Sequence, residues 1–471
     1  MRKWFYGILL LVSAPLFCPA QSLDEVIRLA QDSTVTAFQS RYQYEYHDQL
    51  YAQFLALRKP QLELNVTPNY QRLISDPTRD YVYLRNFDRF SAAAQLKLSQ
   101  KVLGLGGDAY VESKAIWSEY FGRDQIDRPR DFVAIPFSVG YQQSLLGYNP
   151  YRWEKTVEDQ RLAAARKQLD YDLRRIAEEA TARYFRLACA QGTLDMCLRN
   201  KQTADTLYAI AKEKASIAMV SLAELRSLEL QRLNAANALL SARNEEQLAR
   251  ESLAAYLRTD AQAFSGRLSV PATTKLIYLT EEDALELART NSPAFQQKQA
   301  ELTEARQQQQ KTRKEQGVKV GVDLGLGMQQ LSNTFLGAYQ HPQFYMTGSV
   351  SLRVPLMDHG AAKRGNAAAS AWVSREEQAL REVERALCED VRTTLDNLRS
   401  HEQMLTHTAD AVAMADEVFE LTAENYANGL CDINTYSLAQ SRRDNAYNQH
   451  LTAMAQYWTT YYHLLTLTQY E

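Results

Sequence analysis

Strict alternation between apolar and other residues is the clearest pattern in the chain. In 318–328 every second position is apolar, and 346–356 follow the same rule with one glycine at position 348. A period of two predicts β-strands with one apolar face. Each segment has the roughly ten residues that a transmembrane β-strand needs. A half-buried strand of a soluble sheet has the same period, so both interpretations stay open at this point.

The first half of the chain repeats the alternation in residues 62–66, 94–98 and 133–141. A glycine-rich segment at 103–108 predicts a tight turn, and it is followed by a further strand-like stretch at 109–117. These residues form an added hairpin that the second half lacks. The sequence leaves open whether this hairpin joins the sheet or folds over one end of it as a plug.

Long segments without proline flank the strands. Residues 22–57 and 280–315 are predicted to be helical, and 153–215 and 361–426 are each followed by a second helix at 223–257 and 433–465. A helix of about 60 residues is roughly 90 Å long, which no compact globule holds. An apolar stripe at three- and four-residue steps (Leu387, Val391, Leu395 and Leu398) predicts that one face is buried. A coiled-coil hairpin used as a spacer is the simpler interpretation.

The chain is a tandem repeat. With a shift of 211 positions, residues 139–238 align with 350–449 without a gap, and Arg232 falls on Arg443. Upstream the offset is 257 or 258, so the first half holds about 46 extra residues, between positions 40 and 138. We expect a signal peptide at 1–20, a first repeat at 21–257 with one helix, about four strands and two long helices, a linker at 258–278, and a second repeat at 279–471 with two strands.

The N-terminus has the features of a secretory signal. Arg2 and Lys3 precede a short apolar core at 7–12, and small residues around Ala20 suit cleavage before Gln21. The alternatives are an anchor helix, for which the core is too short, and lipidation at Cys18, which the sequence leaves open. No later segment approaches 18 apolar residues. The mature chain is therefore expected to be exported.

Composition and motifs exclude several function classes. The formal charge is −3, with 53 basic and 56 acidic residues, which gives no basic footprint for nucleic acid. None of the seven histidines has the spacing of metal ligands. We expect no cofactor, no metal and no enzymatic activity. Basic clusters at Arg58-Lys59 and at 311–314 precede strands and are read as solvated helix ends or as anchors beside lipid headgroups.

Four cysteines remain in the mature chain, and an even number in an exported protein suggests disulfides. Cys189 and Cys197 are eight residues apart on one predicted helix, about 12 Å by rise, and cannot bond. With the repeats in register, Cys388 and Cys431 fall far from both. The sequence predicts four free thiols.

The duplicated order of helix, strands and two long helices resembles the TolC-like outer-membrane efflux proteins. The resemblance also includes Ala284-Leu285-x-Leu287-Ala288 and the Tyr426-x-x-Gly429 turn. It implies a fold that is mainly α with a transmembrane β-barrel portion, a homotrimer in the outer membrane of a Gram-negative cell, and an α-barrel that extends into the periplasm. It further implies passive export together with a periplasmic adaptor protein and an inner-membrane transporter or secretion ATPase. Relatives contribute four strands per copy, so an added hairpin predicts six, or about 18 for a trimer.

The resemblance also assigns site residues. The two inter-helix turns, with Ala218, Met219, Gly429 and Leu430, are expected to contact the adaptor, although ordinary hairpin packing is the alternative. Asp432, Thr435 and Leu438 share one face at the start of the last helix and are expected to line the periplasmic aperture. Relatives place two acidic residues at the positions of Thr435 and Leu438 and an arginine at that of Cys431, so this sequence departs from them. Asp432 alternatively serves only as a helix cap.

Two function classes follow from the sequence. The first is the export duct just described, in contact with outer-membrane lipid. The second is a soluble periplasmic coiled-coil scaffold with a small β domain. The exported substrate and the type of pump are not encoded in any pattern of the chain.

Overall fold

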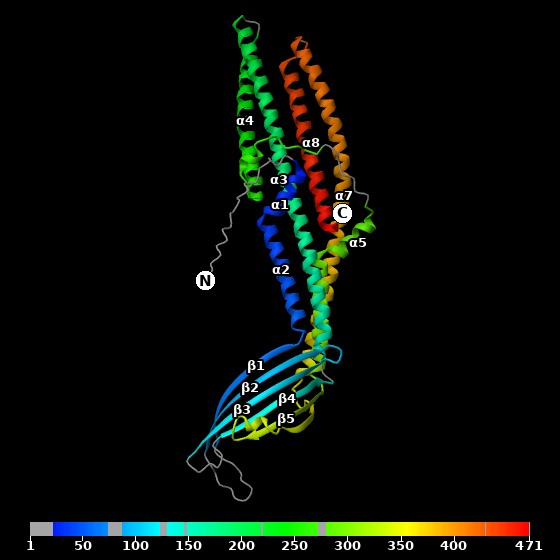
Figure 1. Ribbon diagram of the computed structural model, residues 1–471. Helices are drawn as coiled ribbons and strands as arrows, with labels where there is room; N and C mark the ends of the chain where they lie inside the picture. The colour runs from blue at the N-terminus through cyan, green and yellow to red at the C-terminus, as the bar shows by residue number, and fades with distance from the viewer. Residues whose placement is uncertain are drawn as a thin grey trace, which may run out of the picture. The chain divides into compact units, whose positions relative to one another are not determined.

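The computed structural model describes residues 22–73, 87–122, 130–145, 148–217, 220–271, 279–428 and 430–470. Two compact units make up the chain (Figure 1): unit 1 contains the described parts of 1–44, 166–293 and 384–471, and unit 2 those of 45–165 and 294–383. The predicted signal peptide, residues 1–20, lies outside the described residues. Among the residues described, no helix is both long enough and apolar enough to cross a membrane.

Helices and strands follow one another in the same order in both halves of the chain. The first half holds α1 (Leu23–Ser33), α2 (Val35–Ala56), β1 (Gln61–Leu73), β2 (Phe87–Val102), β3 (Gly107–Gly122), β4 (Arg130–Ser144), α3 (Pro150–Ser216), α4 (Leu222–Leu257) and the 3₁₀ helix η1 (Ala261–Phe264). The second half holds α5 (Glu281–Asn291), α6 (Pro293–Glu315), β5 (Lys319–Ser332), η2 (Gly337–Tyr339), β6 (Gln343–Arg353), α7 (Ala361–Ala427) and α8 (Ile433–Thr468). The predicted mainly helical fold with tandem elements is confirmed.

The long helices agree closely with the sequence prediction. α3 and α7 each contain 67 residues, and α4 and α8 each contain 36. The only proline in any of the four is Pro150, at the first position of α3, where its missing N–H has no helical partner to lose. The four mature cysteines are free, as the spacing predicted.

The prediction of one continuous helix at 22–57 and at 280–315 was wrong, because both segments are broken. Thr34 has an extended backbone between α1 and α2, and its hydroxyl accepts a hydrogen bond from the Ala37 N–H at 3.3 Å. Ser292 is likewise extended between α5 and α6, because a residue before proline, here Pro293, is driven out of the helical region. The two breaks are 258 positions apart, which is the upstream offset of the repeat.

The core of unit 1 is built from helix faces of both repeats. Val391, Leu395 and Leu398 on α7 are buried, as their spacing predicted, together with Tyr184 on α3 and Trp458 on α8. The predicted linker contributes as well: Phe264 and Leu268 are buried, and the Tyr184 hydroxyl donates to the Ser269 carbonyl at 2.7 Å. Residues 258–271 therefore pack on the helices of this unit, and 272–278 lie outside the described residues.

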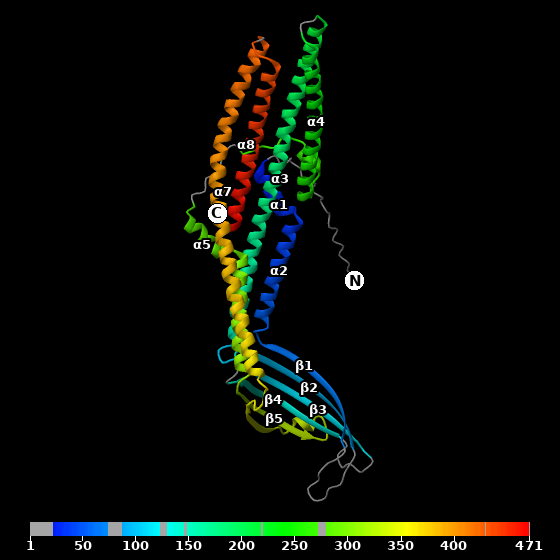
Figure 2. The same ribbon diagram turned by 180° about the vertical axis from the view of Figure 1, so that it is seen from behind.

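Unit 2 contains one curved antiparallel sheet with the strand order β1-β2-β3-β4-β5-β6 (Figures 1 and 2). The added hairpin joins this sheet as β2 and β3, with Val102 opposite Gly107. Its turn places Gly106 at φ +78°, a backbone conformation that glycine adopts without strain and that residues with a Cβ rarely adopt. The register of β4 shifts between Ala134 and Phe137, and Pro136 lies inside this bulge, where no ladder hydrogen bond is lost.

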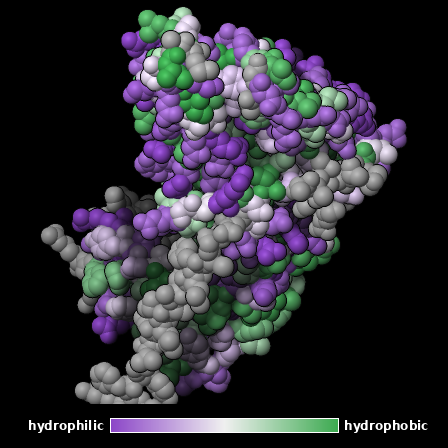
Figure 3. Space-filling view, turned by 90° about the horizontal axis from the view of Figure 1, so that it is seen from above, coloured by the Kyte–Doolittle hydropathy of each residue, from purple (hydrophilic) through white to green (hydrophobic). Residues whose placement is uncertain are grey.

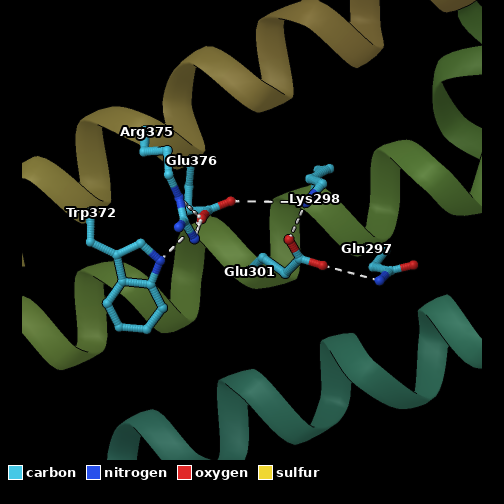
Figure 4. Close-up of polar contacts among 6 residues, drawn as sticks. All are labelled: Gln297, Lys298, Glu301, Trp372, Arg375 and Glu376. Carbon is cyan, nitrogen blue, oxygen red and sulfur yellow. Dashed lines mark hydrogen bonds and ion pairs between the residues drawn. The ribbon is translucent and has the colours of Figure 1, made fainter.

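A buried carboxylate joins the two helices of unit 2 that belong to the second repeat (Figure 4). Glu376 on α7 accepts hydrogen bonds from Trp372 Nε1 at 3.0 Å and Arg375 Nε at 2.8 Å, and lies 4.0 Å from Lys298 Nζ on α6. The hydrogen bonds from Arg375 hold the pKa of Glu376 below its usual range. The carboxylate is thus charged and fully partnered, which fixes the register of α7 against α6.

Candidate functional site

The helical hairpins of unit 1 turn at equivalent positions of the two repeats. Ser221 caps α4 by accepting from the Glu224 N–H at 3.2 Å, and Asp432 caps α8 by accepting from the Thr435 N–H at 3.0 Å. The two caps are 211 positions apart, the offset of the repeat. Both turns lie at the same end of unit 1 (Figures 1 and 2). Viewed toward this end, hydrophobic residues form small groups between hydrophilic ones (Figure 3).

Only part of the predicted adaptor-contact turns can be placed. Ala218, Met219 and Gly429 lie outside the described residues. Leu430 is 75% exposed, and its N–H donates to the Asn425 carbonyl at 2.8 Å, which closes the α7–α8 turn. An exposed leucine at the tip of a hairpin suits contact with another protein.

The three predicted aperture residues share the exposed face of the first turns of α8. Leu438 is 52% exposed, whereas Ile433 and Tyr436 on the opposite face are buried inside the hairpin. The Asp432 carboxylate also accepts a hydrogen bond from the Thr435 hydroxyl. The hydrogen bonds from the Thr435 hydroxyl and N–H hold the pKa of the Asp432 carboxyl below its usual value. The capping role of Asp432 is therefore real. Nothing else in unit 1 covers this face among the described residues, so it is available to a second copy of the chain.

A polar network between the two hairpins was missed by the sequence analysis. Asn200 on α3 donates to Asp444 on α8, and Gln440 donates to the Asn200 amide oxygen at 2.5 Å. Arg443 pairs with Asp444 at 3.3 Å, and both side chains are largely buried. Arg443 belongs to the motif that recurs between the repeats, which was the one available signal in the sequence. The contact across the hairpins joins Asp444 to Asn200, which are far apart in sequence.

Two apolar stripes lie on the outward faces of unit 1. On α4, Leu230, Leu233, Leu240 and Leu248 are exposed, and on α7, Met404, Met414, Val418 and Leu421 are exposed. Successive members of the two sets are three, four, seven, eight or ten residues apart, which places each set along one helix face. The α7 segment 404–424 carries five acidic residues and no lysine or arginine. α4 as a whole carries four arginines and five glutamates, and Arg226 and Arg250 pair with glutamates of the same helix. Each stripe therefore offers an exposed apolar seam to a further helix.

The sheet of unit 2 has one apolar face, as the alternation predicted. Register places Leu64 opposite Leu96, Val139 opposite Leu326 and Val322 opposite Val350, so these side chains share a face. Most of them are exposed, with Val350 at 74%. The β5–β6 connection covers one part: Phe335 packs edge-on against Phe132 at 6.2 Å, and Ala134 is 1% exposed. On β1 and β6 the apolar face stays open.

Both edge strands of this sheet lack a second neighbour among the residues that the structure describes. β1 and β6 each have one neighbouring strand, β2 and β5 respectively. An unpaired edge offers a row of backbone donors and acceptors to another strand. Each of the two edge strands, β1 and β6, can therefore pair with a further strand.

Histidines and acidic residues do not gather into a reaction centre in the part of the chain described. No group of three or more possible metal ligands occurs there. His401 contacts the Thr460 hydroxyl at 3.1 Å and His450 that of Thr408 at 3.1 Å, so both have ordinary packing partners. His463 differs, because Glu178 and Asp390 lie on its two sides at 3.1 and 3.5 Å.

Comparison with known proteins gives a sequence match for part of the chain and a similar fold for nearly all of it. Residues 284–468 match the sequence profile described as "Outer membrane efflux protein". No curated protein has a matching sequence. A membrane protein from Pseudomonas aeruginosa has a similar structure with a TM-score of 0.69 at 14% identity, covering 95% of this chain and 93% of that one.

Two further structures are similar over nearly the full chain. The outer membrane protein VceC from Vibrio cholerae has a TM-score of 0.67 at 12% identity, with 95% of each chain covered. The CmeC outer membrane channel from Campylobacter jejuni has a TM-score of 0.66 at 12% identity, covering 95% of this chain and 85% of that one. At such identities the similarity establishes the fold.

Proposed function

We infer that this chain, whose second repeat belongs to the outer membrane efflux protein family and whose fold is that of outer-membrane channels, is one protomer of an efflux duct in the outer membrane of a Gram-negative cell. The duct gives its substrates a passive path across the periplasm and the outer membrane. Residues 1–20 would be removed on export, leaving the two repeats at 21–257 and 279–471 joined by 258–278.

The open apolar face of the six-stranded sheet is the observation that carries this proposal. Apolar side chains on β1 and β6 are exposed in the single chain, a costly arrangement in water. In lipid the same face is favourable, but the free backbone groups of β1 and β6 then need partners, because hydrocarbon offers none. Pairing β6 of one copy with β1 of the next supplies these partners and closes a barrel.

Three copies would also bury the exposed apolar stripes on α4 and α7. The exposed apolar stripe on α7 of one protomer would pack against the apolar stripe on α4 of its neighbour, which is a head-to-tail contact that closes into a ring. Three copies of six strands give eighteen. Barrels of 16–18 strands leave an aqueous channel, whereas eight strands are filled by side chains.

We assign the two ends of the duct to different tasks. Asp432, Thr435 and Leu438 would line the periplasmic aperture, and the turns with Ala218, Met219, Gly429 and Leu430 would contact a periplasmic adaptor protein. An inner-membrane transporter would supply the energy, because the chain itself needs no catalytic centre for passive export. The proposal therefore includes no enzymatic activity and no cofactor.

Membrane fractionation together with planar-bilayer recording tests the duct. We expect the full-length protein in the outer-membrane fraction, a trimer that dissociates on heating, and ion-conducting channels from the purified trimer. A soluble monomer released by osmotic shock would instead support the coiled-coil scaffold with a small β domain.

A matched pair of variants tests the seam between copies. Met414 is 67% exposed in the single chain and lies on the α7 stripe, whereas Ala413 is exposed beside it but off the stripe. Burying a methionine contributes about 1.5–3 kcal/mol, so Met414→Asp should lower the dissociation temperature of the trimer and Ala413→Asp should leave it nearly unchanged. Equal effects would place the contact elsewhere.

A further inference from the structure

A cleft of about 940 Å³ lies in unit 2 where the strands meet the helices. It is bordered by the end of α2, the β2–β3 turn, the start of α3 and the last turns of α6. Its volume is within the range of sites that hold small molecules. The turn of the added hairpin forms one side of this cleft, because the chain turns back there from β2 into β3 and does not continue into a helix.

The walls of the cleft are held by specific contacts. A Cβ at Gly106 would lie 2.7 Å from the Asn149 side chain, so the turn packs directly against the residue before α3. The Asn149 side chain in turn accepts from the Tyr151 N–H at 3.1 Å. The Tyr151 hydroxyl donates to Asp108 at 2.8 Å at the start of β3. The turn, β3 and the first turn of α3 thus form one connected wall.

Three of the residues that line the cleft are cations. Arg58, Lys155 and Lys314 line it from three different helices or helix ends, and no aspartate or glutamate is among its lining residues in the described part of the chain. None of the three cations forms an ion pair with a described carboxylate; Arg58 lies over the Phe54 ring at 5.1 Å. Asp108 accepts from Tyr151 and does not itself line the cleft, so the three lining cations favour an anionic ligand.

Aromatic and aliphatic side chains complete the lining. Tyr148 accepts a hydrogen bond from Gln307 Nε2 at 2.7 Å, and Trp153 donates to Gln310, so both rings are fixed against α6. Leu103 also lines the cleft, and Leu105 in the same turn is 61% exposed. Tyrosine, tryptophan, lysine and arginine together are the residues that proteins place at the level of lipid headgroups.

The open apolar face of the sheet begins at the same level. Leu62 at the start of β1 and Leu98 near the end of β2 face each other across the register and are exposed. A ligand with an anionic head in the cleft and hydrocarbon along this face would match both surfaces. A phospholipid of the periplasmic leaflet has this construction.

We propose that this cleft binds the phosphate of a phospholipid headgroup, with Arg58, Lys155 and Lys314 as its partners and the acyl chains over Leu103 and Leu105. The proposal rests on the outer-membrane location inferred above. Free phosphate offers the same charge without the hydrocarbon, and the experiment separates the two sources.

Phosphatidylglycerol is titrated into the detergent-solubilised full-length protein, and bound lipid is followed by native mass spectrometry. Brominated phosphatidylglycerol, which quenches nearby tryptophan, reports the place of binding through the difference between wild type and Trp153→Phe. Each lysine beside an anionic lipid is worth roughly fivefold in affinity. Lys314→Gln and Lys155→Gln should therefore each weaken binding about fivefold, and the double variant more.

Lys311→Gln is the matched control, because Lys311 lies on the same helix and does not line the cleft. Unchanged lipid binding in the double variant, or an equal loss in Lys311→Gln, would overturn the site. Displacement of the lipid by inorganic phosphate at similar concentration would overturn the lipid assignment in favour of a soluble anion. The measurement is made in detergent, so it is independent of whether the protein fractionates with the outer membrane or conducts ions.

Discussion

Arg443 on α8 lies over the ring of Phe419 on α7, with its guanidinium carbon 4.0 Å from the ring centroid. In the first repeat Arg232 on α4 lies over Tyr208 on α3 at 4.7 Å. Each residue of the first pair is 211 positions beyond its counterpart in the second. The same contact between a cation and an aromatic face therefore ties together both helical hairpins, and the offset found in the sequence is a structural equivalence.

Replacing Arg443 by methionine keeps the aliphatic stem and removes the cation. The Arg443 side chain is 16% exposed and also pairs with Asp444, so Arg443→Met should lower the free energy of unfolding by about 1–3 kcal/mol. Arg232→Met, which breaks no ion pair with a described carboxylate, should cost about 0.5–1 kcal/mol. Thermal unfolding followed by circular dichroism measures both, and equal shifts would argue against the role of the Asp444 pair.

Stability is expected to depend on pH through His463. The hydrogen bond to Glu178, aided by the charges of Glu178 and Asp390, raises the pKa of His463, although burial acts in the opposite direction. A raised pKa stabilises the folded state fully below the unfolded value of about 6.5, and this contribution is lost as the pH rises through the folded pKa. The melting temperature of the wild type should exceed that of His463→Gln most at acidic pH.

Glu178→Gln is the control for this dependence. It removes the first-named cause of the pKa shift and should flatten the pH dependence of the difference in melting temperature. If His463→Gln and wild type differ by the same amount on both sides of the histidine pKa, the pair has no linkage to folding.

The proposed aperture predicts a change in conductance when the exposed face of α8 is trimmed. Leu438→Ala should raise the single-channel conductance of the purified trimer, because three copies of this side chain would meet at the threefold axis. Ser437→Ala, on another face of the same turn, should leave it unchanged. Unaltered conductance in Leu438→Ala with intact trimers would place the constriction elsewhere.

Asp432 needs two substitutions, because it also caps α8. Asp432→Asn keeps an equally good cap and removes the charge, whereas Asp432→Ala removes both and costs about 0.5–2 kcal/mol of helix stability. A charge at the aperture should make both variants differ from wild type in conductance. A change in Asp432→Ala alone would mean that fraying of the helix, rather than the lost charge, is responsible.

In the proposed barrel, every second residue of a strand should face lipid. Val350→Lys places a charge on the apolar face and should cost about 2–4 kcal/mol near the middle of the bilayer. Ser349→Lys, one residue away on the other face, should cost much less and alter ion selectivity. Membrane insertion of the two variants measures the difference, and equal losses would contradict a barrel.

Gly325 lies on the polar face of β5, directly opposite Thr347 on β6. A Cβ there would lie 2.6 Å from the Thr347 hydroxyl on β6, so the neighbouring hydroxyl would have to move. Alternation in one segment predicts which face a residue occupies. It cannot predict what stands opposite, because that depends on the register between strands.

Local patterns predicted most of the elements. Alternation identified β5 and β6, although the observed strands, Lys319–Ser332 and Gln343–Arg353, end up to four residues from the predicted limits because hydrogen bonding to neighbours sets strand ends. Proline-free length and capping residues gave α3, α4, α7 and α8 to within three residues at either end. The breaks at Thr34 and Ser292 were missed although Pro293 marked the second one.

Contacts across the chain were beyond the reach of the sequence. Asn200 and Asp444 belong to different hairpins, and no period of two or 3.6 residues connects them. The added hairpin could be recognised, but its place was undecided until β2 and β3 were seen between β1 and β4. The aperture residues remain a prediction, because the axis on which they would meet belongs to an assembly of copies.

The β2–β3 hairpin adds two strands to the sheet without adding a helix, because the turn at 103–106 returns the chain at once. In the proposed duct, the width of the barrel and the number of periplasmic helices can therefore change separately. The smallest step is a pair of strands per copy, since a single extra strand would leave the next helix on the outer side of the membrane. Pore size in such channels thus changes in fixed increments, and a gene segment as short as one hairpin is enough for each.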